Sequence, residues 1–310
     1  MLLSYIVPCH NEEESLPLFY TEANKAAQQL KLKYNLEAEF IFVDDGSSDK
    51  TLNLIKNFKI DNGRVRYLSF SRNFGKEAAI YAGLRAAKGD YLTLLDADLQ
   101  DPPNLLTEMY AEVLSGNYDC VATRRATRKG EPPIRSWFAR RFYSLINKIS
   151  STKLVDGARD FRLFNRKMAD AIIGLGEYNR FSKGIFSWVG FKTKWLSYDN
   201  IERAAGNSKW NFNKLFAYSL EGIFAFSSAP LAIASFLGLF FCALAFVFIA
   251  VIIARTLIWG DPVAGYPSLI TAILFIGGLQ LFCLGIIGQY LARLYLESKK
   301  RPIYIIKEEG

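Results

Sequence analysis

The stretch Tyr91-Leu92-Thr93-Leu94-Leu95-Asp96-Ala97-Asp98-Leu99-Gln100-Asp101-Pro102-Pro103 joins an apolar run to a group of carboxylates and two prolines. The apolar run predicts a buried strand that stops at Asp96. Open α/β sheets bind their ligands at the carboxyl ends of strands, so Asp96 and Asp98 are candidates for a metal or phosphate site. The alternative is a solvated turn in which Asp98 or Asp101 caps the next helix.

Other predicted strands end in the same way. The pattern predicts strands at 2–7, 38–43, 65–70 and 118–123, with helices of about a dozen residues between several of them. Polar pairs follow three of these strands: Asn11-Glu12, Asp44-Asp45 and Arg72-Asn73. This alternation predicts an α/β fold with a largely parallel sheet, in which these loops meet at one edge.

The loops exclude some nucleotide-binding classes and favour another. Neither Gly-x-Gly-x-x-Gly nor Gly-x-x-x-x-Gly-Lys-Ser/Thr follows a predicted strand, which disfavours a dinucleotide oxidoreductase and a P-loop ATPase. Several carboxylates in one cleft repel one another unless a cation balances them. Oxygen ligands select Mg²⁺ or Mn²⁺, which commonly share their coordination with substrate phosphates, so we expect a nucleoside diphosphate as the ligand.

Two long segments lack charged residues and histidine, namely 231–254 and 268–292. Each exceeds the roughly 20 residues that a helix needs to cross a bilayer, which predicts two transmembrane helices rather than a pair of core helices. Basic residues follow the second segment, whereas the connection at 256–267 carries only Asp261. We therefore expect an integral protein of the inner or plasma membrane, with both termini and the large N-terminal part in the cytoplasm.

The net charge of +8 is concentrated in one segment. Nine Lys or Arg residues lie between Arg124 and Lys153, against the single acid Glu131. Such a segment suits nucleic acid or anionic lipid, and the adjacent apolar segments favour the membrane over nucleic acid. Aromatic and aliphatic residues at helical spacing predict an interfacial helix at about 134–150 and a second amphipathic helix at 210–228. We therefore expect a cytoplasmic domain at 1–209, a juxtamembrane helix at 210–228 and a two-helix hairpin with a tail at 229–310.

Several motifs occur together and in a fixed order: Val7-Pro8-x-x-Asn11-Glu12-Glu13, Val43-Asp44-Asp45-Gly46-Ser47-Ser48-Asp49, Arg72-Asn73-Phe74-Gly75-Lys76-Glu77 and Asp96-Ala97-Asp98-Leu99-Gln100-Asp101-Pro102-Pro103. In combination they resemble the inverting family-2 glycosyltransferases. They are most similar to the polyprenyl-phosphate hexose transferases, such as dolichol-phosphate mannose synthase and the bacterial undecaprenyl-phosphate glucosyltransferases. The resemblance continues through Asp156-Gly157-x-x-Asp160-Phe161-Arg162-Leu163 and Arg203-x-x-Gly206-x-Ser208-Lys209.

The resemblance implies a GT-A fold and an inverting transfer of a hexose to a polyprenyl phosphate. We expect UDP-glucose as the donor and UDP as the product, with GDP-mannose or a UDP-N-acetylhexosamine as alternative donors. The implied nucleotide-sugar site comprises Pro8, Asn11, Glu12, Asp44, Asp45, Lys76 and Asp96, and the sequence leaves open which of Asp44 and Asp45 contacts the base. The implied Mg²⁺ or Mn²⁺ ligands are Asp96, Asp98 and Gln100.

The resemblance also implies an acceptor site and catalytic residues. The acceptor phosphate is expected at Arg124, Arg135, Arg140, Arg203, Ser208 and Lys209, since arginine suits bidentate phosphate contacts. The catalytic candidates are Asp98, Asp156 and Asp160. A lipid monophosphate is already largely dianionic at pH 7, so Asp156 acts either as a base or only to position other groups.

Two other functions compete with this interpretation. Processive polysaccharide synthases of the same superfamily carry Gln-x-x-Arg-Trp, which does not occur here. A membrane-tethered nucleotide-sugar binding protein without catalysis would not need both the acidic motif and the basic residues. Gln280 and Gln289, with several glycines in the second apolar segment, also predict association between copies of the chain.

Overall fold

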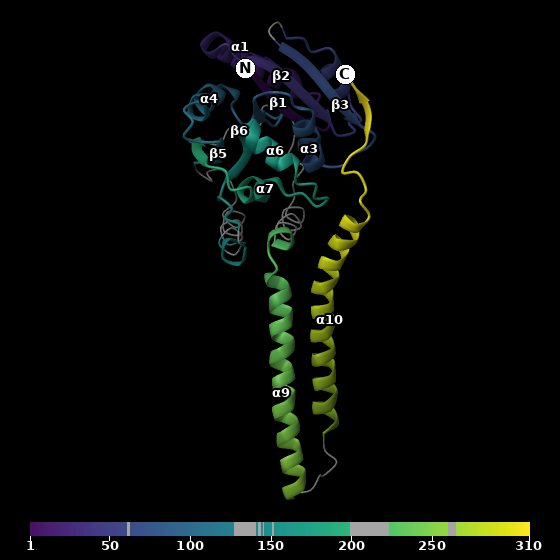
Figure 1. The fold of residues 1–310 in the computed structure, drawn as a ribbon. Helices are drawn as coiled ribbons and strands as arrows, with labels where there is room; N and C mark the ends of the chain where they lie inside the picture. The colour runs from purple at the N-terminus through teal and green to yellow at the C-terminus, as the bar shows by residue number, and fades with distance from the viewer. Residues whose placement is uncertain are drawn as a thin grey trace.

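The computed structural model describes residues 1–60, 63–126, 141, 144, 146–150, 152–198, 223–259 and 265–310. An α/β domain lies at one end, and two long helices extend from it side by side (Figure 1). The interfacial helix predicted at 134–150 and the helix predicted at 210–228 lie mostly outside the described residues, although 146–149 and 223–226 are helical.

One eight-stranded sheet forms the centre of the domain, in the order β7-β5-β6-β4-β1-β2-β3-β8. The pairings β1–β2, β1–β4, β2–β3 and β5–β7 are parallel, while β3–β8, β4–β6 and β5–β6 are antiparallel. The sheet is thus mixed and mostly parallel, as the strand–helix alternation predicts. Its strands are β1 (Leu2–Cys9), β2 (Glu37–Asp44), β3 (Gly63–Phe70), β4 (Tyr91–Leu94), β5 (Cys120–Arg125), β6 (Ala158–Asn165), β7 (Thr193–Tyr198) and β8 (Ile306–Glu309).

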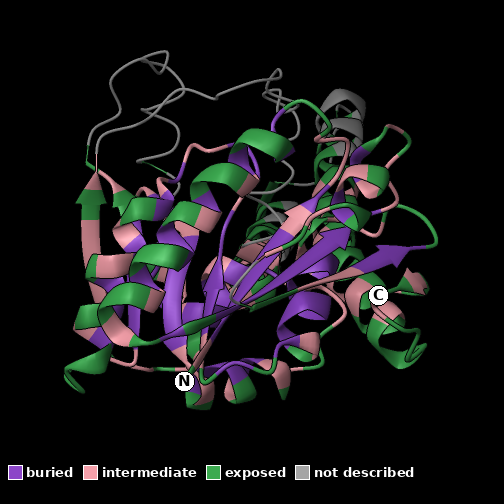
Figure 2. Ribbon diagram, turned by 90° about the horizontal axis from the view of Figure 1, so that it is seen from above, coloured by how far each residue is buried: buried purple, intermediate pink, exposed green. Residues whose placement is uncertain are grey.

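Helices cover both faces of the sheet, so the central strands are buried on both sides (Figure 2). Alternate residues of β1 show this arrangement: Tyr5 and Val7 pack among residues of one face, and Ile6 packs on the other. The first face carries α1 (Leu16–Tyr34), α2 (Thr51–Lys56), the short 3₁₀ helix η1 (Pro103–Leu105) and α4 (Leu106–Leu114). The second carries α3 (Lys76–Ala86), α6 (Arg166–Ile173) and α7 (Ser182–Trp188).

The two long helices are α9 (Ala229–Trp259) and α10 (Tyr266–Ser298). Their apolar windows, Ala229–Phe248 and Phe275–Ser298, have mean hydropathies of 2.6 and 1.6, and 6% and 0% of these windows is buried. A core helix of a soluble protein would be mostly buried, so the exposure of these apolar surfaces agrees with the two membrane helices predicted from the sequence.

The C-terminal tail returns from α10 to the sheet (Figure 1). Strand β8 pairs with β3, and the carboxylate of Glu308 accepts a hydrogen bond from the Tyr67 hydroxyl at 2.9 Å and lies 2.5 Å from Lys56 Nζ. The ring of Tyr304 stacks on Phe70 with centroids 5.1 Å apart. Both chain ends therefore lie in the α/β domain, on the same side of the helical hairpin.

Glu39 is a buried carboxylate in the middle of the domain and gives a test of the fold. Its Oε2 accepts hydrogen bonds from Ser4 Oγ at 2.6 Å and from the Lys88 backbone N–H at 2.9 Å, and its Oε1 lies 2.8 Å from Arg64. Burial opposes ionisation, but these donors and the arginine charge outweigh it and hold the pKa of Glu39 below its ordinary value.

We therefore expect Glu39→Gln to lower the free energy of unfolding by about 2 kcal/mol at pH 7, since the buried donors lose a charged acceptor. A lowered carboxyl pKa gives stability above the ordinary Glu pKa that is lost as pH falls through the folded-state value. The difference between the two proteins should therefore shrink on acidification, as measured by thermal unfolding in detergent. The control is Glu37→Gln, at a side chain that is 62% exposed; equal effects of the two substitutions would contradict the assignment.

Candidate active site

A cavity of about 290 Å³ lies at the carboxyl ends of β1, β2 and β4 and the start of α3. The strand ends expected to converge therefore do so. The lining residues are Pro8, Cys9, His10, Glu12, Asp45, Asn73, Gly75, Lys76, Ala79, Asp96, Ala97 and Asp98. Four of these are carboxylates and one is a lysine, so an occupant that carries cations or hydrogen-bond donors is favoured.

The adjacent residues Asp44 and Asp45 have different surroundings. Asp44 is buried behind the cavity, where its carboxylate accepts from the Ser47 backbone N–H at 3.1 Å and from Ser69 Oγ at 2.8 Å. Asp45 lines the cavity and accepts from the backbone N–H groups of Phe74 (2.6 Å) and Gly75 (2.9 Å). Burial raises the pKa of Asp45, although these two donors act in the opposite direction. Of the pair, Asp45 is thus the one placed to meet a ligand.

The loop after β2 packs closely on the loop between β3 and α3. Gly46 has φ +64°, and a Cβ there would come within 2.5 Å of the Arg72 carbonyl carbon. A side chain at this position would push the two loops apart. The close approach keeps Asp45 within reach of the Phe74 and Gly75 amides.

The loop after β1 is held to the loop after β2 by several hydrogen bonds. The backbone N–H of Asn11 donates to Ser47 Oγ at 3.0 Å, and its side-chain oxygen accepts from the Ser48 N–H at 2.8 Å. The backbone N–H of Glu12 donates to Thr51 Oγ1 at 2.8 Å, while the Glu12 side chain lines the cavity. Asn11 therefore supports the loop, and Pro8 and Glu12 face the cavity directly.

Asp96 and Asp98 both line the cavity, as the acidic motif predicts. Leu99 follows with φ +57°, an uncommon conformation for this residue type, which turns the chain sharply after Asp98. The Gln100 side chain accepts from Arg159 at 3.3 Å and is absent from the cavity lining among the described residues. Of the predicted metal ligands, Asp96 and Asp98 are therefore brought together, and Gln100 is directed elsewhere.

The donor set of this cavity suits Mg²⁺ or Mn²⁺ bound together with a phosphate ligand. Within the described part of the chain, no group of three or more His, Cys, Asp or Glu side chains is arranged to hold a metal ion. Mg²⁺ is usually held by one or two carboxylates and completes its coordination with water and substrate phosphates. Asp96 and Asp98 match that arrangement.

Lys76 connects two of the predicted site residues. Its Nζ lies 2.7 Å from Asp96 and 2.6 Å from Asp160 of β6. Burial opposes ionisation of Asp160, but the charges of Lys76 and Lys183 outweigh it and hold the pKa of Asp160 well below its ordinary value. The ammonium of Lys76 therefore neutralises part of the acidic wall and remains protonated.

A buried group behind the cavity was not predicted as part of the site. Asp101 accepts a hydrogen bond from the Tyr198 hydroxyl and lies 3.6 Å from Arg159 Nε. Burial raises the pKa of Asp101 to about 6, while Arg159 acts in the opposite direction. Arg159 and Tyr198 belong to β6 and β7, and no local sequence motif connects them to the acidic stretch.

The remaining predicted residues lie away from the cavity or outside the described chain. Asp156 is exposed in the turn before β6, and Arg124 is exposed near the end of β5 with its Nε 2.9 Å from Ser197 Oγ. Arg135, Arg140, Arg203, Ser208 and Lys209 lie outside the described residues.

The sequence matches the model of the family described as "Glycosyl transferase family 2" over residues 4–173. This match covers more than half of the chain and includes every lining residue of the cavity. The chain belongs to glycosyltransferase family 2. It is therefore a glycosyltransferase with a GT-A-type α/β domain, followed by two long apolar helices.

Two relatives of this glycosyltransferase match it over nearly their full length. It is 43% identical over 309 residues to the bactoprenol glucosyl transferase of Shigella phage SfV, covering 100% of this chain and 99% of that protein. It is 42% identical over 307 residues to the prophage bactoprenol glucosyl transferase homolog of Escherichia coli (strain K12), covering 99% of each. Both matches extend through α9 and α10.

A solved structure is similar to part of this chain at low sequence identity. It is glucosyl-3-phosphoglycerate synthase from Mycobacterium tuberculosis in complex with Mn²⁺, UDP-glucose and phosphoglyceric acid. The match has a TM-score of 0.46 and 19% identity, and covers 72% of this chain and 77% of that one.

Proposed function

We propose that this glycosyltransferase transfers glucose from UDP-glucose to bactoprenol phosphate, a polyprenyl phosphate, with inversion at the sugar and release of UDP. The observation that carries this proposal is the 43% identity to a bactoprenol glucosyl transferase across the whole chain, including both apolar helices. The cavity supports it, since its carboxylates and Lys76 suit a nucleoside diphosphate bound beside a cation.

The chemistry needs one bond to form and one to break. An oxygen of the lipid phosphate attacks the anomeric carbon, and the bond from that carbon to the diphosphate breaks, with its electron pair leaving on UDP. The lipid phosphate is largely dianionic at pH 7, so it attacks without losing a proton, and no general base is required. Asp156 and Asp160 therefore act as positioning residues in this proposal.

The residues around the cavity have different roles in this proposal. Pro8, Glu12 and Asp45 surround the nucleoside, with Asn11 and Asp44 holding their loops in place. Asp96 and Asp98 would hold Mg²⁺ or Mn²⁺, which supplies Lewis-acid stabilisation of the leaving diphosphate when bound. Lys76, held by Asp96 and Asp160, lies where it can donate to the same diphosphate.

The acceptor is presented by the membrane in this proposal. Helices α9 and α10 cross the bilayer as a hairpin with the catalytic domain in the cytoplasm, and Arg124 with the predicted basic residues attracts the lipid phosphate.

A Cβ added at Gly277, Gly278, Gly285 or Gly288 would meet no atom within 4 Å in the described chain. These positions are therefore open to a second copy of the chain.

The proposal is tested by turnover. Purified protein with undecaprenyl phosphate and Mg²⁺ is expected to form a lipid-linked sugar from labelled UDP-glucose at least about tenfold faster than from GDP-mannose or UDP-N-acetylglucosamine. Tenfold selectivity needs about 1.4 kcal/mol of differential transition-state binding, which one lost hydrogen bond supplies. No lipid-linked product with any donor would refute the transfer, and a faster reaction with another donor would refute only the choice of glucose.

A further inference from the structure

A second cavity, of about 550 Å³, lies between the α/β domain and the domain-facing end of α10. Three arginines from separate parts of the chain line it: Arg72 from the β3–α3 loop, Arg180 from the loop before α7, and Arg293 from α10. Asn73 and Gly75 line both this cavity and the 290 Å³ cavity of the candidate active site, which is called the donor cavity below after the proposed function. At most the β3–α3 loop separates the two.

Among the residues that the structure describes, the three arginines are in contact with aromatic rings rather than paired with carboxylates in salt bridges. Arg72 and Arg180 each lie over an aromatic ring, Phe74 and Tyr81 respectively, at 4.2 Å, and Arg293 lies 5.6 Å from the ring of Phe224. Within the described ranges, none of the three forms a salt bridge. A cavity with this charge attracts an anion.

The carboxylate that does line the cavity is already engaged. Glu77 accepts hydrogen bonds from the backbone N–H and the hydroxyl of Ser182, which hold the start of α3 to α7. Burial raises the pKa of Glu77 and lowers that of Arg180, even though Glu77 and Glu177 act on Arg180 in the opposite direction. Among the described lining residues, Glu77 is one carboxylate against three arginines, which leaves the lining with a net positive charge.

Two buried hydrogen-bond donors at this cavity also have no acceptor among the described residues. They are Nε of Arg180 and Nδ2 of Asn179, both side-chain atoms of lining residues. Buried donors are normally paired, so an occupant with several acceptor oxygens is expected here. A phosphate group provides such oxygens and suits the planar donor arrangement of arginine.

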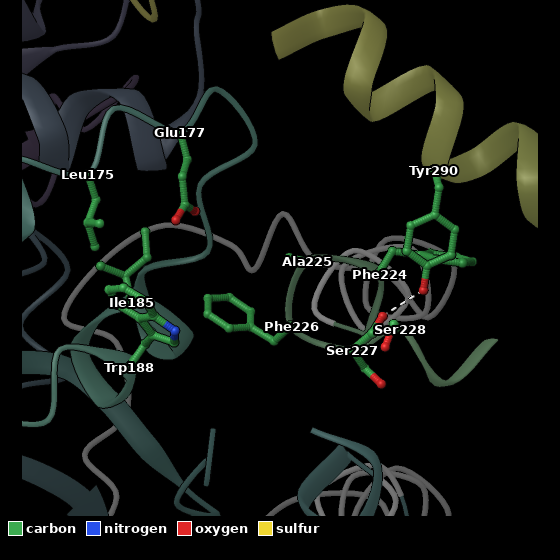
Figure 3. A pocket seen from close by; sticks show the side chains of 10 residues that line it. All are labelled: Leu175, Glu177, Ile185, Trp188, Phe224, Ala225, Phe226, Ser227, Ser228 and Tyr290. Carbon is green, nitrogen blue, oxygen red and sulfur yellow. Dashed lines mark hydrogen bonds between the residues drawn. The ribbon is translucent and has the colours of Figure 1, made fainter. Parts of the chain in front are cut away.

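A neighbouring cavity of about 420 Å³ shares Ala225 with the arginine cavity, and its lining combines apolar and aromatic side chains with Glu177, Ser227 and Ser228. Figure 3 shows Ile185, Trp188 and Phe226 on one side and Tyr290 of α10 on the other, where the Tyr290 hydroxyl donates to the Ser227 carbonyl at 2.6 Å. Tyr290 and Arg293 are separated by less than one helical turn on α10. The apolar and aromatic side chains of this lining can pack against the chain of a lipid, whereas an inorganic ion makes no contact of that kind.

We propose that the cavity formed by Arg72, Arg180 and Arg293 binds the phosphate group of a membrane lipid, whose apolar chain lies along the adjoining cavity and α10. The bound phosphate contacts the β3–α3 loop, whose Phe74 and Gly75 amides hold Asp45 in the donor cavity. Lipid binding therefore steadies the donor site from the membrane side. The site is separate from the acceptor residues predicted around Arg124, and its occupancy does not depend on glucosyl transfer.

The test measures lipid retention in the absence of donor. Full-length protein in neutral detergent is incubated with undecaprenyl phosphate, phosphatidylglycerol, phosphatidylcholine or inorganic phosphate, and retained molecules are counted by native mass spectrometry. The variants are Arg72→Gln and Arg293→Gln, singly and together, with Lys88→Gln at an exposed side chain outside the cavity as the matched control. Arg180 is left intact because it packs on Tyr81, and unchanged thermal unfolding verifies the fold of each variant.

We expect retention of one or both anionic lipids, with affinity falling about tenfold for each arginine removed, which corresponds to about 1.4 kcal/mol per charge-assisted hydrogen bond. The anionic lipid that binds more tightly is identified as the source of the phosphate group. The proposal would be overturned if the double variant retained as much anionic lipid as the unmodified protein. It would also be overturned if phosphatidylcholine were retained as well as the anionic lipids, or if inorganic phosphate bound as tightly as they do. Turnover with UDP-glucose is measured separately, so failure of this site is distinguishable from failure of the transferase assignment.

Discussion

Asp98→Asn is expected to lower the rate of glucosyl transfer by about a thousandfold while leaving the fold intact. Asp98 is 7% exposed and lines the donor cavity together with Asp96. The amide keeps the shape of the side chain but loses the charge that would hold a divalent ion against the diphosphate. A thousandfold loss corresponds to about 4 kcal/mol of transition-state stabilisation, the size expected for a lost electrostatic contact at a developing charge.

Two measurements separate this effect from a general loss of structure. Turnover is compared with that of Asp170→Asn, whose carboxylate is 63% exposed on α6 and is not among the lining residues of the cavity. Mn²⁺ binding in the presence of UDP is followed by electron paramagnetic resonance, and we expect it to weaken in Asp98→Asn alone. Full activity together with unchanged Mn²⁺ binding in Asp98→Asn would refute the metal assignment.

Lys76→Met is expected to lower kcat/KM by about a hundredfold and to make activity sensitive to acid. The substitution removes the ammonium that lies between Asp96 and Asp160. Burial is the largest influence on Asp160 and raises its pKa, and the charge of Lys76 is the largest influence that lowers it. Without that charge, the pKa of Asp160 should rise from its lowered value. A pH profile of kcat/KM should therefore show an acid limb at higher pH than in the unmodified protein, because Asp160 is protonated earlier as pH falls.

The conservative variant Lys76→Arg provides the matched control. It keeps a positive charge between the two carboxylates, so its acid limb should stay close to that of the unmodified protein even if geometry lowers its rate. If Lys76→Met and Lys76→Arg shift the acid limb equally, charge neutralisation at Asp160 is not the role of Lys76.

The sequence predicts where the cavity lies because its position follows from local rules. Apolar runs of four to eight residues mark the strands, and parallel strands place their following loops at one edge. Asp45, Asp96 and Asp98 are brought together for this reason. The family resemblance adds Lys76 and Asp160, but it does not show that they lie 2.6 Å apart. The two residues are 84 positions apart in the sequence, and Asp160 belongs to the antiparallel strand β6, so no local pattern reveals their contact.

Adjacent residues at a strand end are harder to assign. Asp44 and Asp45 have the same chemistry, yet one is directed to Ser69 and the other to the Phe74 and Gly75 amides. Gln100 is directed to Arg159, which is 59 residues away. These orientations depend on distant partners, so composition and spacing do not determine them.

Strand β8 was not predicted, for a related reason. Ile306–Glu309 is four residues long and mostly charged, which is a weak strand pattern. Its pairing with β3, together with the contacts of Glu308 and Tyr304, depends on the hairpin bringing the tail back to the domain.

That tail constrains how the catalytic domain can move. A domain joined to a helical hairpin by one connection can rotate about that single joint, whereas this domain is joined at two places, before α9 and again through β8. Two attachments restrict rotation of the domain, so the donor cavity keeps a nearly constant position and orientation relative to α9 and α10. With α9 and α10 crossing the bilayer as proposed above, the acceptor lipid reaches the cavity by lateral diffusion in two dimensions, and the domain does not have to reorient between successive transfers.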